Sequence, residues 1–217
     1  MDLIGRQREL HEVTELLEVA PAVVVTGAPG VGKSALARQL APVVWVDAER
    51  AVDESTLLER LAAALDLPLA RWGAVLDGLP GDGVVVVDGA EGARRALPAV
   101  LRRLEGVSVV VTSRAHPPPE CLAPVLELGP LSAADGAELL RARVRSVRRR
   151  AHMPDAALVA LAEALDGVPL ALELAARRLR LYSPDEVAQQ ALGDLVDPAR
   201  PARQDIASEV RAAVEAL

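Results

Sequence analysis

The sequence predicts an α/β fold, in which helices cover a parallel sheet of five strands, followed by a small helical domain. Short valine-rich runs alternate with stretches of helical periodicity up to about residue 130. These valine runs are apolar at nearly every position, which is typical of strands buried on both faces of a parallel sheet. From Gly129 onward only helical patterns of Leu and Ala remain, and they predict the second domain.

Strands and helices are expected to alternate along the first part of the chain. An amphipathic helix over Arg6–Val19 precedes the first strand, because its apolar residues recur at helical spacing. A helix over Ser55–Leu65 follows the second strand, and Ser55 is its expected N-cap. The five strands are expected at residues 23–26, 43–47, 84–88, 107–111 and 125–128, in the spatial order 5-1-4-3-2.

The segment Gly27–Ser34 lies between the first strand and a helical stretch, and it has the pattern G-x-x-x-x-G-K-S of a P-loop. Its glycines let backbone N–H groups turn inward around a polyphosphate, and the helix N-terminus adds a favourable dipole. We expect Lys33 to reach the β- and γ-phosphates and the Ser34 hydroxyl to bind Mg²⁺. The residues expected to bind the nucleotide here are Ala28, Pro29, Gly30, Val31, Gly32, Lys33, Ser34 and Ala35.

Lys33 is the only lysine among the 24 Lys and Arg residues of the chain. A compact ammonium fits against phosphates where a guanidinium is too wide, so lysine at this position of an arginine-using chain points to phosphate binding. The sequence therefore predicts that the protein binds a nucleoside triphosphate.

Polar residues follow the third and fourth strands, at the sheet edge where ligands of open α/β sheets bind. Asp88 ends the third strand, as a Walker B aspartate does, and we expect it to hold Mg²⁺ together with Ser34. Thr112 and Ser113 place two hydroxyls at the same edge, and Arg114 is expected to sense or stabilise the γ-phosphate.

The composition excludes several other kinds of site and partner. Aromatic residues make up only 1% of the chain, so a stacking platform for single-stranded nucleic acid is not expected. The single cysteine, Cys121, excludes an intrachain disulfide and a cysteine-rich zinc site. The net charge of −7 gives no overall attraction to nucleic acid. With no signal peptide and no apolar run of membrane-spanning length, we expect a cytoplasmic protein.

The second domain is expected to consist of helices separated by Pro and Gly. Ser132 is the expected cap of its first helix, and the arginine-rich segment Arg141–Arg150 follows. Val144 and Val147 within that segment favour a solvated helix face over a nucleic-acid patch. Further helices are expected at residues 155–165, at 168–181 and after Ser183, and a linker at 195–204 precedes a last helix at 206–217.

In their order along the chain, these motifs resemble the STAND class of P-loop ATPases, which contains the NB-ARC domains. The nearest resemblance is to the ATPase module of large bacterial transcription regulators of the antibiotic-regulatory and LuxR type. The matching segments are Leu3–Glu9 (hhGRE), the P-loop, Asp88, Val111–Arg114 (sensor T-S-R), Leu128–Ser132 (L-x-x-L-S) and Asp166–Leu172 (D-G-x-P-L-A-L). The resemblance implies a nucleotide-binding domain at 1–130, a helical domain at 131–194, and a linker with the start of a winged-helix-like subdomain at 195–217.

The resemblance also implies residues around the adenine. Ile4, Gly5 and Arg6 lie in the segment that contacts the base in this class. Pro169, with Leu170 beside it, would pack against the adenine from the helical domain. These five residues complete the expected nucleotide site.

Position 89 departs from the pattern of many related hydrolases, which carry a second acid directly after the strand aspartate. This chain has Gly89 there, and Glu91 is the nearest carboxylate. The expected catalytic residues are therefore Lys33, Asp88, Glu91 and Arg114. We expect slow hydrolysis, which suits a switch whose bound nucleotide sets the arrangement of its domains.

We therefore expect a switch in signal transduction that binds ATP or ADP with Mg²⁺. Its expected partners are a second copy or another protein, met on activation, and its output is assembly or a transcriptional effector. We expect no membrane partner and no direct contact of this segment with nucleic acid. Two other classes remain open, namely an AAA+-like DNA-associated ATPase, which DNA would stimulate, and a small-molecule P-loop kinase, which needs an acceptor pocket and a mobile lid.

Overall fold

The computed structural model of the chain describes residues 3–68, 70–79, 81–147, 153–179, 181–184 and 186–188. The chain forms two compact units, each assembled from more than one segment. The first unit comprises Met1–Gly5, Pro29–Gly32 and Gly129–Leu217, and the second comprises Arg6–Ala28 and Lys33–Leu128. The segment predicted as a linker and subdomain start at 195–217 lies outside the described residues, as do positions 148–152 of the arginine-rich stretch. The boundaries predicted at residues 130 and 194 stay predictions.

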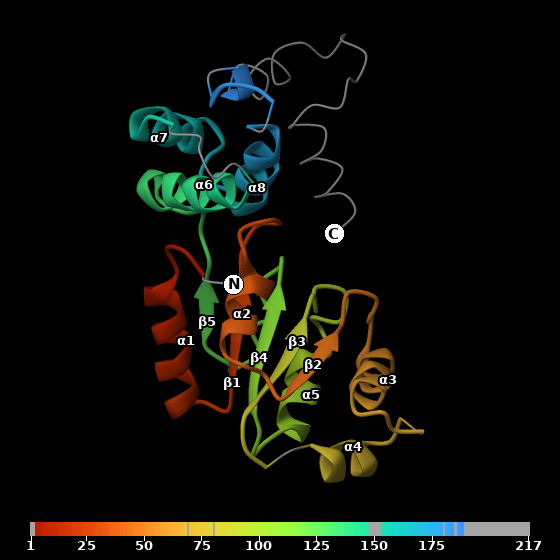
Figure 1. Cartoon of the computed structure of the whole chain (residues 1–217). Coiled ribbons are helices and arrows are strands. Elements are labelled where there is room, and N and C mark those ends of the chain that lie inside the picture. The colour runs from red at the N-terminus through yellow and green to blue at the C-terminus, as the bar shows by residue number, and fades with distance from the viewer. Residues whose placement is uncertain are drawn as a thin grey trace. The chain divides into compact units, whose positions relative to one another are not determined.

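One parallel sheet of five strands forms the centre of the second unit (Figure 1). The strands lie in the order β2-β3-β4-β1-β5, which confirms the predicted order read from the opposite edge. The register pairs Val24 of β1 with Val111 of β4, and Val87 of β3 with the same Val111. The strands are β1 (Ala22–Thr26), β2 (Val44–Asp47), β3 (Val84–Asp88), β4 (Ser108–Ser113) and β5 (Val125–Glu127).

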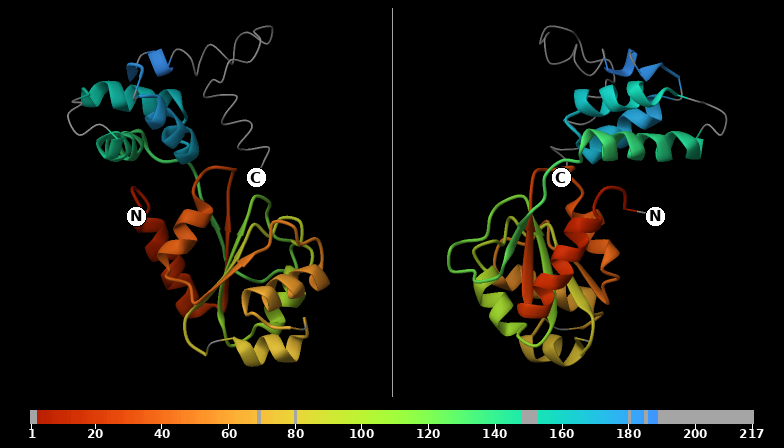
Figure 2. Two further views of the ribbon diagram at one scale, coloured as in Figure 1. Left: turned by 45° about the vertical axis from the view of Figure 1, so that its right-hand side comes forward. Right: turned by 90° about the vertical axis from the view of Figure 1, so that its left-hand side faces the viewer.

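Helices cover both faces of this sheet, as the three views in Figures 1 and 2 show. Helices α1 (Gln7–Val19) and α2 (Lys33–Gln39) lie against β1 and β4 on one face. Helices α3 (Glu54–Ala64), α4 (Trp72–Gly78) and α5 (Leu97–Arg103) share a buried core with the other face. The expected alternation of strand and helix is thus present, although the sequence analysis had located neither α4 nor α5.

The valine runs supply both layers of this core. Val24, Val87 and Val111 belong to the buried cluster beneath α3, α4 and α5, whereas the alternate valines of the same strands are equally buried on the opposite face. Branched side chains pack well on a pleated surface, and burying one valine side chain fully contributes about 1.5–3 kcal/mol. The continuous apolar pattern therefore reflects a sheet with no solvated face.

Helix α3 begins one residue earlier than predicted, and its cap is a different residue. Asp53 is the N-cap, and its carboxylate accepts a hydrogen bond of 2.8 Å from the backbone N–H of Thr56. The Thr56 hydroxyl in turn accepts one of 3.1 Å from the backbone N–H of Asp53, which completes a capping box. The prediction that Ser55 caps this helix is therefore wrong, because Asp53 takes that position and Ser55 falls inside the first turn.

The first unit contains the helical part of the chain. Its helices are α6 (Ala133–Val147), α7 (Asp155–Ala164) and α8 (Pro169–Arg178), and their buried Leu and Ala side chains form a separate core. Ser132 caps α6 as predicted, since its hydroxyl accepts a 3.1 Å hydrogen bond from the N–H of Asp135. Within the described ranges, every helix is too short or too polar to span a lipid bilayer.

Candidate nucleotide-binding site

The P-loop leads from the end of β1 into the first turn of α2. Gly30 and Gly32 adopt positive φ angles of 77° and 100°, which a loop that turns its backbone around phosphates needs and other residues rarely adopt. Pro29–Gly32 belong to the first unit, whereas Ala28 and Lys33 on either side of them belong to the second.

Lys33 lies at the start of α2 with its ammonium folded against the loop. Its Nζ donates hydrogen bonds of 2.9 and 3.0 Å to the carbonyl oxygens of Gly27 and Ala28. Burial lowers the pKa of Lys33 below its ordinary value of 10.5, nearby Glu91 and Asp88 oppose this lowering, and Arg114 adds to it. The group that is to bind phosphate is thus held in place and surrounded by the charged groups predicted for the site.

Asp88 accepts hydrogen bonds from two hydroxyls at the carboxyl edge of the sheet. The Ser34 hydroxyl donates to Asp88 Oδ1 at 2.7 Å, and the Thr112 hydroxyl donates to the same oxygen at 2.5 Å. The backbone N–H of Gly89 donates to Thr112 Oγ1 at 3.0 Å, which fixes the direction in which that hydroxyl points. Thr112 therefore orients Asp88, a role that the sequence analysis did not give it.

The register could have identified this role of Thr112. Val87 pairs with Val111, so Asp88 and Thr112 are the next residues along neighbouring strands and lie on the same face. Ser113 lies on the other face, and its hydroxyl donates to the carbonyl oxygen of Ala115 at 2.7 Å. Of the two predicted hydroxyls, that of Thr112 contacts Asp88 in the site, and that of Ser113 closes a turn with Ala115.

Ser34 and Asp88 fit the magnesium ion that the P-loop implies. Their oxygens converge to within 2.7 Å, and hydroxyl and carboxylate oxygens, completed by phosphate oxygens and water, are the ligands that Mg²⁺ prefers. When bound, the ion supplies positive charge to the β- and γ-phosphate oxygens.

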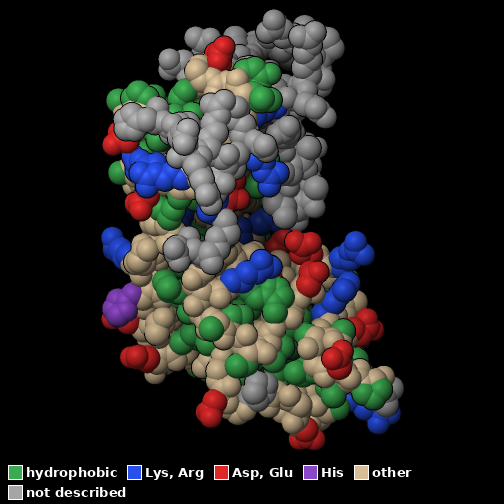
Figure 3. All heavy atoms as spheres, viewed as in Figure 1, with side chains coloured by type: hydrophobic (Ala, Val, Ile, Leu, Met, Phe, Trp, Pro, Cys, Tyr) green, Lys and Arg blue, Asp and Glu red, His purple; other side chains and the backbone are tan. Residues whose placement is uncertain are grey.

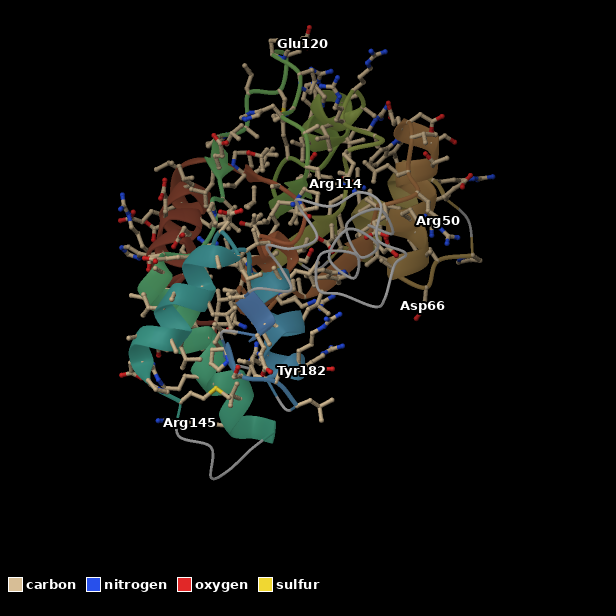
Figure 4. All side chains as sticks on the ribbon, turned by 90° about the horizontal axis from the view of Figure 1, so that it is seen from above. Arg50, Asp66, Arg114, Glu120, Arg145 and Tyr182 are labelled. Atoms are coloured by element: carbon tan, nitrogen blue, oxygen red, sulfur yellow. The ribbon has the colours of Figure 1, made fainter. Side chains whose placement is uncertain are left out.

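Glu91 and Arg114, two of the predicted catalytic residues, form an ion pair with each other. Arg114 donates from Nε and Nη2 to Glu91 Oε1, at 2.6 and 2.5 Å. Arg114, which is labelled in Figure 4, follows β4 directly, and Glu91 lies in the loop after β3, so neighbouring strands bring the two side chains together. Glu91 is 20% exposed and Arg114 35% exposed.

The structure explains why position 89, directly after β3, is a glycine and not an acidic residue. Its φ angle is +76°, and a Cβ added there would lie 2.7 Å from Cγ of Glu49. A side chain at this position would meet both backbone strain and a steric clash. Glu91, two residues further along the loop, is the next carboxylate in the sequence after Asp88.

The other predicted residues lie in both units. Arg6 is 5% exposed and donates to Glu9 at 2.6 Å at the start of α1, and Ala35 lies in α2. Ile4, Gly5, Pro169 and Leu170 belong to the first unit. Within that unit, Pro169 is the first residue of α8, and the N–H of Leu170 donates to the carbonyl oxygen of Gly30 at 3.2 Å. The contribution of these residues to nucleotide binding stays a prediction.

The sheet order, the P-loop and the sequence family together define a P-loop ATPase. The family model described as an AAA ATPase domain matches residues 2–217, and the chain belongs to this family. It is therefore a nucleotide-binding ATPase module.

The curated relatives share a moderate part of the sequence. Uncharacterized protein Rv0894 of Mycobacterium tuberculosis and Uncharacterized protein Mb0918 of Mycobacterium bovis are each 32% identical to the chain over 210 residues. Each match covers 85% of this chain and 52% of the relative. The chain thus spans about half the length of the curated relatives it matches.

Two solved structures have the same fold. The Walker-type ATPase PABY2304 of Pyrococcus abyssi matches with a TM-score of 0.61 and 18% identity, over 89% of this chain and 73% of that chain. The STAND protein with a tetratricopeptide repeat sensor, PH0952 of Pyrococcus horikoshii, matches with a TM-score of 0.57 and 20% identity, over 79% of this chain and 29% of that chain.

Proposed function

We propose that this chain is the nucleotide switch of a STAND-type signalling ATPase of the kind found in antibiotic-regulatory and LuxR-type regulators. It binds ATP or ADP with Mg²⁺, hydrolyses ATP slowly, and controls self-assembly, a protein partner or a transcriptional effector. The observation that carries the proposal is the ion pair between Glu91 and Arg114, next to the P-loop lysine. In this pair, the candidate base Glu91 contacts Arg114, the candidate sensor of the γ-phosphate.

The ion pair explains slow turnover. Glu91 Oε1 accepts both hydrogen bonds from the Arg114 guanidinium, and a carboxylate oxygen held in this way is not available to orient a water molecule. Glu91 can activate a water molecule only after Arg114 has moved away. The site is therefore inactive in hydrolysis while the ion pair between Glu91 and Arg114 is formed.

The same pair makes the site sensitive to the γ-phosphate. A terminal phosphate beside Lys33 offers Arg114 a competing anion with several acceptor oxygens, whereas ADP offers none at that position. With ATP, Arg114 turns to the phosphate and Glu91 is released to orient water. After loss of the γ-phosphate the pair re-forms, so the two nucleotides stabilise two arrangements of the loops after β3 and β4.

Two comparisons support the switch without deciding its output. One structure of the same fold is named as a STAND protein with a repeat sensor, and the curated relatives are about twice as long as the matched segment. Both are compatible with an ATPase module that is coupled to further domains.

A second candidate is an AAA+-like ATPase that acts with DNA; the family description, an AAA ATPase domain, agrees with the ATPase part of this candidate and does not mention DNA. The arginine-rich stretch gives this candidate little support among the described residues. Arg141 pairs with Asp155 at 2.7 Å and Arg143 pairs with Glu173 at 2.8 Å, so both arginines tie the helices of the first unit together. We therefore favour the switch and treat DNA stimulation as the result that would reverse this choice.

The first experiment measures the nucleotide that the purified protein retains and its single-turnover hydrolysis rate. We expect tightly held ADP, negligible steady-state turnover and no stimulation by DNA. Glu91→Gln should lower the single-turnover rate about 100-fold or more with ADP binding retained, whereas Arg114→Gln should reduce the preference for ATP over ADP. Arg71→Gln, at an exposed arginine just before α4, is the matched control. Fast turnover with weakly held ADP would contradict the switch.

A further inference from the structure

A pocket opens between the loops that follow β3 and β4, lined by residues that are not among those predicted for the nucleotide site. Its volume is about 600 Å³, and its lining includes Arg94, Arg95, His116, the triplet Pro117–Pro119 and Glu120. All these residues belong to the second unit, and none of them is part of the P-loop or of the expected magnesium site. The proposed switch does not use this pocket.

Positive charge dominates the lining. Two guanidiniums and an imidazole face one carboxylate, in a chain whose net charge is −7. On the face of the second unit seen in Figure 3, acidic and basic side chains both surround a region of hydrophobic and uncharged atoms. Among the described residues, neither Arg94 nor Arg95 forms an ion pair, so a ligand would not have to displace a carboxylate from them.

The lining is also partly preorganised. Arg94 is half-buried, and its Nη1 donates a hydrogen bond of 3.3 Å to the carbonyl oxygen of His116, which links the two walls. Pro117–Pro119 restrict the backbone of one wall and offer no N–H donors. The proline wall offers no backbone donors, whereas the two guanidiniums have N–H groups that can bind a ligand.

We propose that this pocket binds the phosphoryl group of a small phosphorylated molecule or of inorganic phosphate. A planar guanidinium presents paired N–H donors that match two oxygens of a phosphoryl group, and two such groups with an imidazole suit a doubly charged anion. Glu120, at the outer end of its loop in Figure 4, limits the affinity by repulsion. The phosphorylated ligand binds to residues outside the P-loop and the expected magnesium site, and the proposal includes no chemical reaction of this ligand.

The test titrates inorganic phosphate into the protein by calorimetry, with the P-loop saturated by Mg²⁺ and a non-hydrolysable ATP analogue. We expect one phosphate per chain in moderate salt. The double variant Arg94→Gln/Arg95→Gln should bind it about tenfold more weakly or worse, whereas Glu120→Gln should bind it about two- to fivefold more tightly. The matched control, Arg71→Gln/Arg102→Gln, removes two exposed arginines elsewhere on the second unit and should bind phosphate like the unaltered chain.

Binding of the ATP analogue is measured first for every variant. Failure of the analogue to bind would overturn the proposed function, and the phosphate titration in Lys33→Ala would still test the pocket. No phosphate binding, or equal binding to the unaltered chain and the Arg94→Gln/Arg95→Gln variant, would overturn the pocket alone. A parallel titration with glycerol 3-phosphate separates the sources, because tighter binding of the ester indicates an organic phosphate and equal binding indicates the free ion.

Discussion

At the scale of single residues, the surroundings of Lys33 determine how nucleotide affinity depends on pH. Burial lowers the pKa of its ammonium below 10.5, so the free protein loses this proton earlier than an ordinary lysine does as the pH rises. Bound phosphates favour the charged form. We expect ADP affinity to be constant near neutral pH and to fall on the alkaline side before pH 10.5 is reached, with proton uptake on binding. Calorimetry in two buffers of different ionisation enthalpy measures this uptake. Lys33→Met should bind ADP more weakly and without proton uptake. An uptake equal to that of the unaltered chain would assign the proton to another group.

Thr112 allows a second test at this scale, because its hydroxyl orients the carboxylate expected to hold magnesium. Thr112→Val keeps the shape of the side chain but leaves Asp88 without this donor. We expect the apparent Mg²⁺ affinity of the nucleotide complex to fall about 10- to 100-fold, as is usual when a group behind a metal ligand is lost. Ser113→Ala is the matched control, since that hydroxyl contacts Ala115 instead. An equal loss in both variants would show that the effect is a general disturbance of β4.

At the scale of elements, the Asp53 cap of α3 makes the stability of the folded chain depend on pH. Backbone and side-chain hydrogen bonds from Thr56 lower the pKa of Asp53 below 3.8. A lowered carboxyl pKa stabilises the folded state above the unfolded value, and this contribution disappears as the pH falls through the folded value. We expect Asp53→Ala to lower the urea midpoint at neutral pH and to differ progressively less from the unaltered chain as the pH falls below 3.8. Asp53→Asn should retain much of the cap, because an amide oxygen still accepts from Thr56. Ser55→Ala is expected to change little, and a loss as large as that of Asp53→Ala would contradict the assigned cap.

The elements also show why sequence reasoning succeeds in some places and fails in others. The valine runs identify the strands because a buried parallel sheet needs apolar residues at every position, and the P-loop identifies its own turn and helix. Helices α4 and α5 were not located because each has only seven residues, too few for a clear helical period. The pairing of Glu91 with Arg114 and the role of Thr112 depend on which strands are neighbours, and a linear pattern does not contain that information.

At the scale of the whole molecule, two separate hydrophobic cores predict two separable unfolding transitions. One core lies between the sheet and α3, α4 and α5, and the other joins α6, α7 and α8. Both tryptophans, Trp45 and Trp72, belong to the second unit, so tryptophan fluorescence reports on that unit alone, whereas circular dichroism reports on both.

Two matched substitutions test this independence. Leu61 of α3 and Leu172 of α8 are both fully buried, and replacing either by alanine should destabilise its own unit by about 2–5 kcal/mol. We expect Leu61→Ala to lower the midpoint of the fluorescence transition, because both tryptophans share its unit. Leu172→Ala should leave that midpoint unchanged and shift only the part of the dichroism transition that fluorescence does not follow. An equal shift of both probes in both variants would mean that the units unfold as one cooperative body, and bound nucleotide would then stabilise the whole chain rather than the sheet-containing unit.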